Sequence, residues 1–272
     1  RADRWTVSLG GRYDVARSET LNNLTGNTAT REDEAFTGRA GVSYQLANGL
    51  APYVSYMESF LPTTGTDAAG NPFEPETAHQ YEVGVKYQPN TDTLVTLAWF
   101  DLTREDYLTT NPTTFASEQK GEANSRGLEV EARTRLFRAL DVIASYTYTD
   151  AEITRASNPV EEGEPLEYTP EHEAALWGKY NFRGGVLHGL GLGAGVRYIG
   201  KSFGAAFNAD NSALEVPDVT LVDAAISYDI GQVSLGLHAQ NLLDEKYVAT
   251  AFDSSGTYGT RREVTGSVTY RF

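Results

Sequence analysis

Few residues of this sequence could do bond-making chemistry, and their spacing predicts no catalytic or metal centre. The 272 residues include no cysteine, which excludes a disulfide framework, a thiolate metal site and a cysteine nucleophile. Neither a G-x-S-x-G nor an H-E-x-x-H motif occurs, and the four histidines share no metal-ligand spacing. We therefore expect no enzyme, no resident metal and no cofactor. The histidines are His79, His172, His188 and His238.

Two other patterns, a glycine row and a set of acidic residues, have simple interpretations. The alternate glycines Gly189, Gly191, Gly193 and Gly195 resemble a dinucleotide loop, but no helix follows them. They fall on one face of a strand, where they leave room for close approach, for instance by something that fills a barrel lumen. The acidic residues are expected to form a solvated face, with a Ca²⁺ or lipopolysaccharide-bridging site as the weaker alternative. They are Asp33, Glu34, Glu161, Glu162 and Glu164.

Charge and hydropathy narrow the class of protein further. The net charge is −15, which disfavours nucleic acid as a partner. No apolar run approaches the roughly 20 residues of a transmembrane helix, and the mean hydropathy is −0.40. The 16 tyrosines suit surfaces that are apolar at one end and wet at the other. Such a chain can still face lipid if its apolar residues alternate with polar ones.

Period-two alternation runs through the whole chain and predicts about twelve antiparallel strands. In one segment, Tyr81, Val83, Val85 and Tyr87 alternate with Glu82, Gly84 and Lys86. In the next segment the apolar side is read as Leu94, Ala98, Phe100 and Leu102. The fold class expected from this pattern is all-β.

A soluble β-sandwich also alternates, but two features favour a transmembrane barrel. Connections are short and long in strict alternation, with long ones at 14–34, 61–77, 103–118, 150–170, 200–216 and 244–261. The polar face carries too many charges for a dry core. We expect an antiparallel barrel in a Gram-negative outer membrane, with short periplasmic turns and long extracellular loops. The charged residues are Arg39, Lys86, Glu129, Glu131, Arg133, Lys179 and Arg197.

The last residue fits the same interpretation. The first connection is long, so the first strand runs outward, and an even number of strands returns the chain to the side of the short turns. The final strand, Val264–Phe272, ends there on an aromatic residue. Phe272 is therefore predicted to act as an assembly signal read by the barrel assembly machinery.

Several stretches of the chain match motifs of one known family. They are Leu50–Tyr56 with Glu58–Phe60, Gly70–Thr77, Gln80–Tyr87, Ser125–Ala132, Ser145–Ala151 and Asn241–Val248. In these stretches the chain resembles the TonB-dependent ferric-siderophore receptors, most closely the ferrichrome (hydroxamate) type. The resemblance follows the order of the sequence and covers nearly all of it.

The resemblance implies a 22-stranded barrel preceded by a plug domain and a TonB box. Residues 1–272 would then be the C-terminal part of that barrel, about twelve strands, with plug and TonB box not present. A twelve-stranded barrel that closes on itself is the alternative.

The function implied is active uptake of a ferric siderophore, energised by TonB with ExbB and ExbD. Iron would travel as cargo inside its chelator rather than as a cofactor. Outer-membrane lipid and lipopolysaccharide are further expected partners, and the full-length protein would be a monomer. A passive porin-like channel, a surface receptor for phage or host, and a barrel enzyme such as a phospholipase or protease are the rival functions.

Two aromatic residues are carried over as candidate ligand contacts. In ferrichrome receptors an aromatic side chain of the last extracellular loop touches the siderophore, and Phe252 falls at that position, with Tyr258 in the same loop. Packing within the loop is the alternative role for both. Ala251 and Thr257 stand where the enterobacterial receptor has a cysteine pair, so the identity of the siderophore stays open.

Overall fold

The computed structural model describes residues 4–21, 23, 26, 28–207, 213–252 and 255–272. Within them the chain forms β-strands joined by turns and loops, with two short 3₁₀ helices, η1 (Pro159–Glu161) and η2 (Gly185–Leu187). In these residues no helix is long and apolar enough to cross a membrane. The all-β prediction is confirmed.

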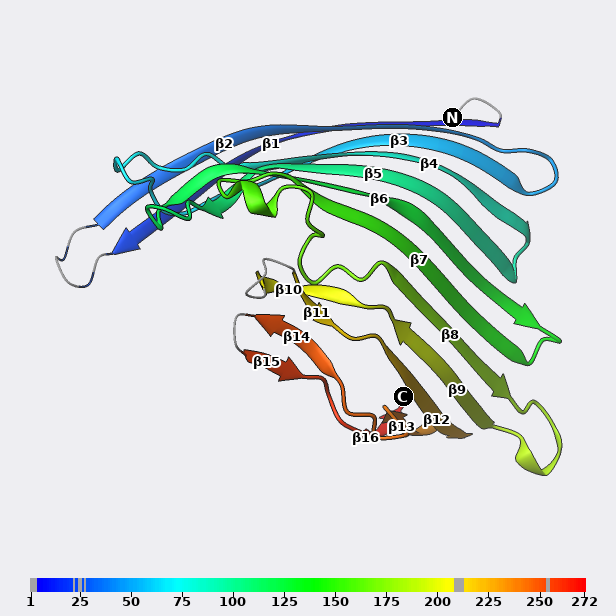
Figure 1. Cartoon of the computed structure of the whole chain (residues 1–272). Helices are drawn as coiled ribbons and strands as arrows, with labels where there is room; N and C mark the ends of the chain where they lie inside the picture. Colours follow the sequence, from blue (N-terminus) through cyan, green and yellow to red (C-terminus); the bar gives the residue numbers. More distant parts are fainter. Residues whose placement is uncertain (1–3, 22, 24–25, 27, 208–212, 253–254) are drawn as a thin grey trace.

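One antiparallel sheet of twelve strands makes up most of the molecule. Each strand pairs with the next member of the sheet, and together they form a single curved wall (Figure 1). The predicted strand number is confirmed for this sheet. The strands are β1 (Trp5–Leu21), β2 (Thr28–Tyr44), β3 (Leu50–Leu61), β4 (Glu76–Asn90), β5 (Thr93–Thr110), β6 (Ser117–Leu136), β7 (Leu140–Arg155), β8 (His172–Asn181), β9 (Leu190–Ile199), β12 (Val219–Ile230), β13 (Val233–Gln240) and β16 (Glu263–Tyr270).

Four further strands form two hairpins, both inside segments predicted to be irregular loops. β10 (Ser202–Phe207) pairs with β11 (Ala213–Val216), and β14 (Val248–Phe252) pairs with β15 (Ser255–Tyr258). Both hairpins lie at the long-loop end of the wall, on the left in Figure 1.

The predicted loops 14–34 and 103–118 are also wrong in their extent. Strands β1 and β2 stay paired from Trp5–Tyr44 out to Leu21–Thr28, and β5 and β6 stay paired out to Thr110–Ser117. Here most side chains on both faces are polar, so the apolar alternation fades while the backbone pairing continues. The backbone ladder of the sheet continues into these hairpins.

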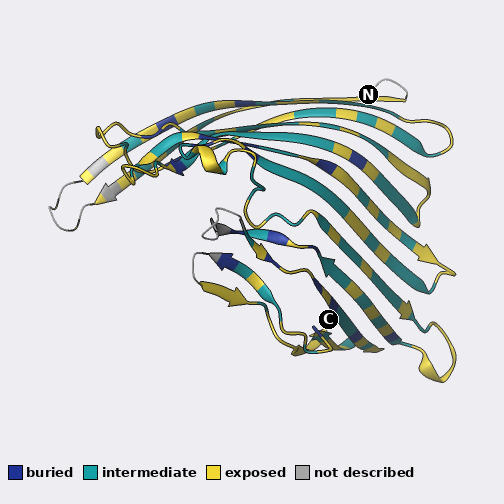
Figure 2. Cartoon of the chain, viewed as in Figure 1, coloured by how far each residue is buried: buried dark blue, intermediate teal, exposed yellow. Residues whose placement is uncertain are grey.

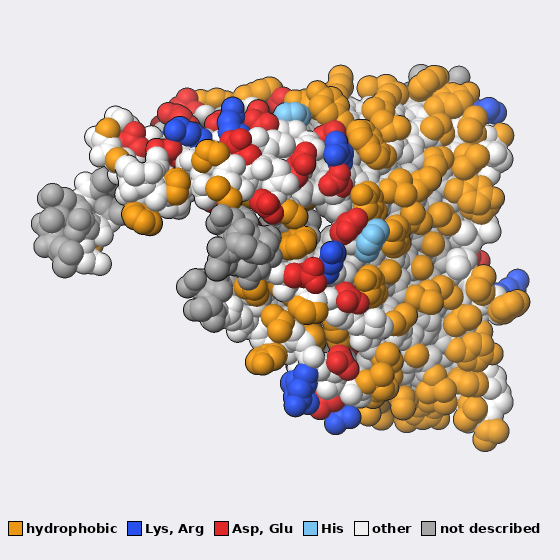
Figure 3. All heavy atoms as spheres, viewed as in Figure 1, with side chains coloured by type: hydrophobic (Ala, Val, Ile, Leu, Met, Phe, Trp, Pro, Cys, Tyr) orange, Lys and Arg blue, Asp and Glu red, His pale blue; other side chains and the backbone are white. Residues whose placement is uncertain are grey.

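The outer face of the wall is an apolar belt, bounded on the left in Figure 3 by charged side chains and histidine. On this face Val83 pairs with Val54 on one side and with Trp99 on the other, and all three are exposed. Exposed bands recur along the strands of the twelve-stranded sheet (Figure 2), and Leu221 is the one large side chain among the described residues that is fully buried. A single-layer wall leaves this face for lipid to cover.

Aromatic side chains border the belt at both ends. At the short-turn end Trp5 packs against Tyr44, with ring centroids 4.6 Å apart. At the long-loop end Tyr56 packs against Tyr81 at 4.9 Å. On β4 the belt runs from Tyr81 to Tyr87, six residues or about 20 Å along the strand.

The expectation for β5 needs a correction. Its register places Ala98 opposite Gly84 and Glu129, so Ala98, with Leu94, Phe100 and Leu102, faces inward. The outward residues are Val95, Leu97 and Trp99. Because both faces of β5 are apolar, alternation alone could not tell which one meets lipid.

The sheet does not close on itself. Among the described residues β1 pairs with β2 alone and β16 with β13 alone. The alternative of a self-closed twelve-stranded barrel is therefore wrong for this structure.

Candidate functional site

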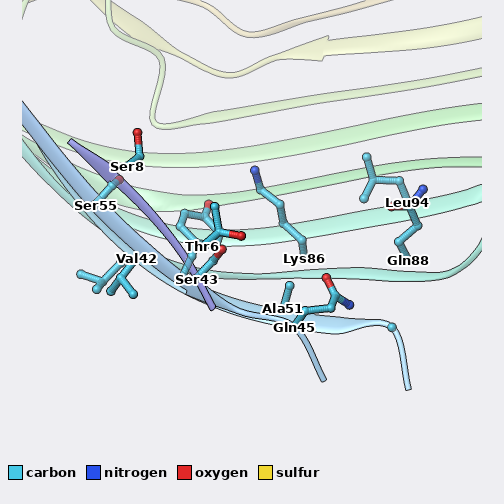
Figure 4. A pocket seen from close by; sticks show the side chains of 14 residues that line it. Thr6, Ser8, Val42, Ser43, Gln45, Ala51, Ser55, Lys86, Gln88 and Leu94 are labelled. Atoms are coloured by element: carbon cyan, nitrogen blue, oxygen red, sulfur yellow. The ribbon is translucent and has the colours of Figure 1, made fainter. Parts of the chain in front are cut away.

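The charged residues predicted to share one face do share it, and that face is the concave one. The register links them across strands: Lys86 pairs with Thr96, which pairs with Glu131. Figure 4 shows Lys86 pointing from the wall into the space that the sheet encloses. The wall is thus apolar outside and polar inside, as a hydrated lumen requires.

A hollow of about 430 Å³ lies against this inner face, near the short-turn end of β1–β5 (Figure 4). Tyr53 borders it and donates a hydrogen bond of 2.5 Å to Glu82. The Lys86 ammonium lies 5.0 Å from the centroid of the Tyr53 ring. The rest of the lining mixes hydroxyl-bearing side chains with apolar ones: Thr6, Ser8, Ser43 and Ser55 lie beside Val42, Val54 and Leu94.

The glycine row is occupied by side chains of the neighbouring strand. A Cβ atom at Gly193 would lie 2.5 Å from Cζ2 of Trp177, and one at Gly195 would lie 2.6 Å from its Cε3. At Gly191 a Cβ atom would lie 2.7 Å from Cε of Lys179. The expectation of close approach is confirmed. The suggested occupant, something from the lumen, is wrong, because the Trp177 ring and the Lys179 stem of β8 fill the space.

A polar network joins the lumenal wall to the last outer loop. Arg197 of β9 donates two hydrogen bonds to Asp223 of β12, at 2.6 and 3.1 Å. The Asp223 carboxylate also accepts the backbone N–H of Asn241 at 2.9 Å. The Asp223 carboxylate therefore connects Arg197 on the inner face to the first residue of the loop.

Asn241 fixes the base of that loop. It is buried, has a φ of 47°, and follows β13 directly. Its side-chain amide donates to the carbonyls of Glu245 and Thr260 at 2.9 and 3.0 Å, and its Oδ1 accepts the N–H of Glu245 at 2.8 Å. One side chain thus ties together both ends of the segment that carries β14 and β15.

An ion pair between Asp244 and Arg261 also joins the two ends of this loop. Arg261 donates to Asp244 through Nε at 2.9 Å and through Nη2, and the N–H of Arg262 donates to the same carboxylate at 3.1 Å. These bonds, the Arg261 bond foremost, lower the pKa of Asp244 to about 2.

The outer loops pack on one another. Tyr168, in the loop after β7, donates from its hydroxyl to the carbonyl of Ala251 in β14 at 3.2 Å. Its backbone N–H donates to the carbonyl of Phe203 in β10 at 2.7 Å. A Cβ atom at Gly204 would lie 2.0 Å from the Ala251 carbonyl oxygen. Three segments far apart in sequence therefore form one layer at the long-loop end.

Both candidate ligand residues belong to the β14–β15 hairpin, one at its base and the other near its tip. Tyr258 pairs with Val248 at the base and is 80% exposed. Phe252 ends β14 and pairs with Ser255 toward the tip, and its side chain lies outside the described residues. Phe272, the predicted assembly signal, follows β16 and is fully exposed, with its ring 6.4 Å from that of Tyr270. The roles of all three remain predictions.

The acidic loop residues have partners more often than expected of a solvated face. Asp33 is buried against Arg31 at 2.5 Å, and Glu34 accepts the Tyr13 hydroxyl at 2.6 Å. Glu161 accepts from Asn158 at 3.1 Å. Across the described ranges, no group of three or more His, Asp or Glu side chains is arranged to hold a metal ion.

The histidines have neighbours in the wall. His172 lies on the outer face, where its Nδ1 is 3.0 Å from the Tyr146 hydroxyl, and His238 pairs with Thr265 on the inner face. Sequence reasoning missed Arg197, Asp223 and Asn241 as a unit. The signal was the Asn-Leu-Leu-Asp stretch at 241–244, which directly follows a predicted strand.

Comparison with known families gives one match that covers most of the chain. The model of the TonB-dependent receptor-like β-barrel matches residues 1–242. The ferrichrome outer membrane transporter/phage receptor of Escherichia coli is 42% identical over 99% of this chain and 36% of its own length. The ferrioxamine receptor of Yersinia enterocolitica is 36% identical over 99% of this chain and 38% of its own length. The chain therefore spans well under half the length of these relatives.

Solved structures share the same fold. The outer-membrane ferripyoverdine receptor of Pseudomonas aeruginosa, bound to ferripyoverdine, superposes with a TM-score of 0.79 at 26% identity. That match covers 99% of this chain and 36% of the receptor chain. The siderophore receptor PiuA of Acinetobacter baumannii superposes with a TM-score of 0.81 at 24% identity, over 99% of this chain and 41% of its own.

Proposed function

We propose, since this chain belongs to the TonB-dependent receptor β-barrel family, that it forms part of a receptor that takes up a ferric siderophore. The family lies in the outer membrane of Gram-negative bacteria, and the apolar belt of this wall fits that place. The observation that carries the proposal is the outer β14–β15 hairpin, held by Asn241 and Asp223 at the mouth of a polar lumen. A ligand arriving from outside would meet this hairpin first.

The substrate class proposed is the ferric hydroxamates. Two relatives are named for ferrichrome and for ferrioxamine, at 42% and 36% identity. A bulky, largely neutral chelate is best held by exposed aromatic and polar groups on loops. Tyr258 and Phe252 stand on such a loop. The iron would be substrate, enclosed by its chelator.

The remaining partners follow from this proposal. The longer protein would have 22 strands, of which residues 1–272 supply the C-terminal twelve, together with a plug and a TonB box elsewhere in its sequence. TonB, with ExbB and ExbD, would supply energy to the plug. Phe272 would be read by the barrel assembly machinery, lipopolysaccharide would surround the outer rim, and the whole protein would act as a monomer.

The test measures binding of ferrichrome and of ferrioxamine B to the full-length protein, with quenching of the protein's fluorescence as the signal. We expect saturable quenching, weakened about five- to thirtyfold by Phe252→Ala or Tyr258→Ala, as for the loss of an aromatic contact of 1–2 kcal/mol. Phe115→Ala is the matched control, because Phe115 lies on a different outer loop and is as exposed as Tyr258, at 82% against 80%. No binding of any ferric chelate, together with a steady ion conductance, would favour a passive channel and refute the proposal.

A further inference from the structure

Two short turns at the periplasmic end expose apolar and basic side chains. In the turn between β6 and β7, Phe137 is 90% exposed, and Phe137 and Arg138 have φ angles of 50° and 59°. Positive φ at both central residues is typical of hairpin turns built on Asn-Gly. A phenylalanine and an arginine are poor residues for this backbone, so the turn itself does not explain their presence.

The turn between β8 and β9 has the same character. It contains η2, in which Val186 is fully exposed and Leu187 about half exposed. Arg183 precedes them. Since β7 pairs with β8, the two turns are neighbours along the rim of the wall. We call Phe137, Arg138, Arg183, Val186 and Leu187 the periplasmic foot.

The foot continues the apolar belt. Leu136 and Leu140 pair with each other on the outer face directly beside Phe137, and Leu140 pairs with Tyr180. The Tyr180 ring packs on Phe182 with centroids 4.8 Å apart. Apolar side chains therefore line the outer face up to the start of both turns.

The short-turn end carries a net positive charge, whereas the net charge of the whole chain is negative. The chain carries −15, yet the described residues of the short turns and the strand ends beside them include five arginines against three aspartates. Within the described part neither Arg138 nor Arg183 is in an ion pair. Figure 3 shows Lys or Arg side chains projecting beyond the right-hand, periplasmic edge of the belt. The residues are Arg4, Arg135, Arg138, Arg183 and Arg271, against Asp92, Asp141 and Asp229.

We propose that the periplasmic foot binds the headgroups of anionic phospholipids in the inner leaflet of the outer membrane. Phe137, Val186 and Leu187 would insert at the boundary between acyl chains and headgroups, which accommodates exposed apolar tips. Arg138 and Arg183 would pair with lipid phosphate, as basic side chains beside a membrane do. The proposal needs the wall to span the membrane but does not depend on transport of a siderophore.

The chain has no cysteine, so a single introduced cysteine can be labelled with a nitroxide at one position within it. Full-length protein with Val186→Cys would be labelled and reconstituted in vesicles of phosphatidylethanolamine, with or without phosphatidylglycerol. Collision with oxygen and with a water-soluble nickel chelate then reports depth. Gln232→Cys is the matched control, because it sits on the short polar turn between β12 and β13.

We expect the label at 186 to be protected from the nickel chelate and the label at 232 to be accessible. Retention of phosphatidylglycerol by purified protein should fall about fivefold for Arg138→Gln or Arg183→Gln, while Arg126→Gln on the opposite rim should change nothing. Equal accessibility at 186 and 232 would overturn the proposal. So would protection that is the same in neutral and anionic vesicles and in both arginine variants, since a protein partner or simple apolar contact would then account for it.

Discussion

Replacing Asp223 by asparagine removes the charge that the lumenal wall and the last outer loop share. The carboxylate accepts two bonds from Arg197 and one from the N–H of Asn241, at 2.6, 3.1 and 2.9 Å. Its side chain is 16% exposed and that of Arg197 is 42% exposed. A hydrogen bond to a charged group contributes about 1.5–3 kcal/mol, and the exposure of Arg197 reduces this value. Because the amide can still accept one bond, we expect a local loss of about 1–2 kcal/mol.

The assay is hydrogen exchange of the backbone amides from Leu242 to Arg262 in the full-length protein. A loss of 1–2 kcal/mol makes local opening about five- to thirtyfold more frequent, and exchange should accelerate by the same factor. Amides in the middle of β12 should change less, since the strand keeps its ladder.

Asp150→Asn is the matched control for this prediction. The Arg126–Asp150 pair has similar geometry, at 2.9 Å, but both side chains are about half exposed on the outer face. Exposed pairs contribute about 0–1 kcal/mol, so this variant should leave the last loop unchanged. Unchanged exchange in Asp223→Asn, or an equal effect in Asp150→Asn, would refute the view that Asp223 links wall and loop.

Two further predictions concern the loop and the glycine row. The pKa of Asp244 is lowered to about 2, so its ion pair with Arg261 stabilises the closed loop above about pH 4 and is lost as the pH falls toward 2. Cleavage of the loop by pepsin should increase over that range in the native protein and stay flat in Asp244→Asn; parallel curves would contradict this. Gly193→Ala should destabilise the wall by about 1–3 kcal/mol, measured by denaturant unfolding in detergent, because its Cβ would lie 2.5 Å from the Trp177 ring. Gly266→Ala, whose Cβ meets nothing, is the control, and equal losses in the two variants would refute the packing argument.

The strands of the wall could be predicted from the sequence because apolar and polar residues alternate along most of them. On β4, Val83 and Val85 face outward and Glu82 and Lys86 inward, as alternation indicated. The same rule failed on β5, where Ala98 and Leu97 are both apolar and only the partner strands decide the orientation. Alternation within one strand shows which residues share a face. Pairing with the neighbouring strands then decides which of the two faces points outward.

The site was harder to predict, because its contacts join distant residues. Tyr168 reaches Ala251, and Arg197 reaches Asp223 and through it Asn241. No periodicity marks such pairs, and the polar hairpins β10–β11 and β14–β15 have the composition of loops. The resemblance pointed to the stretch that begins at Asn241, but only the geometry shows what Asn241 holds.

In a wall one layer thick, outward and inward positions differ in how many amino acids they can accept during evolution. On the outer face, side chains such as Val83 and Leu176 meet fluid hydrocarbon, which adapts to any apolar shape. On the inner face, the Trp177 ring rests on Gly193 and Gly195, where one added methyl group collides. Outward positions should therefore exchange readily among apolar residues of any size, while the fit of Trp177 to its glycines should be inherited as a unit.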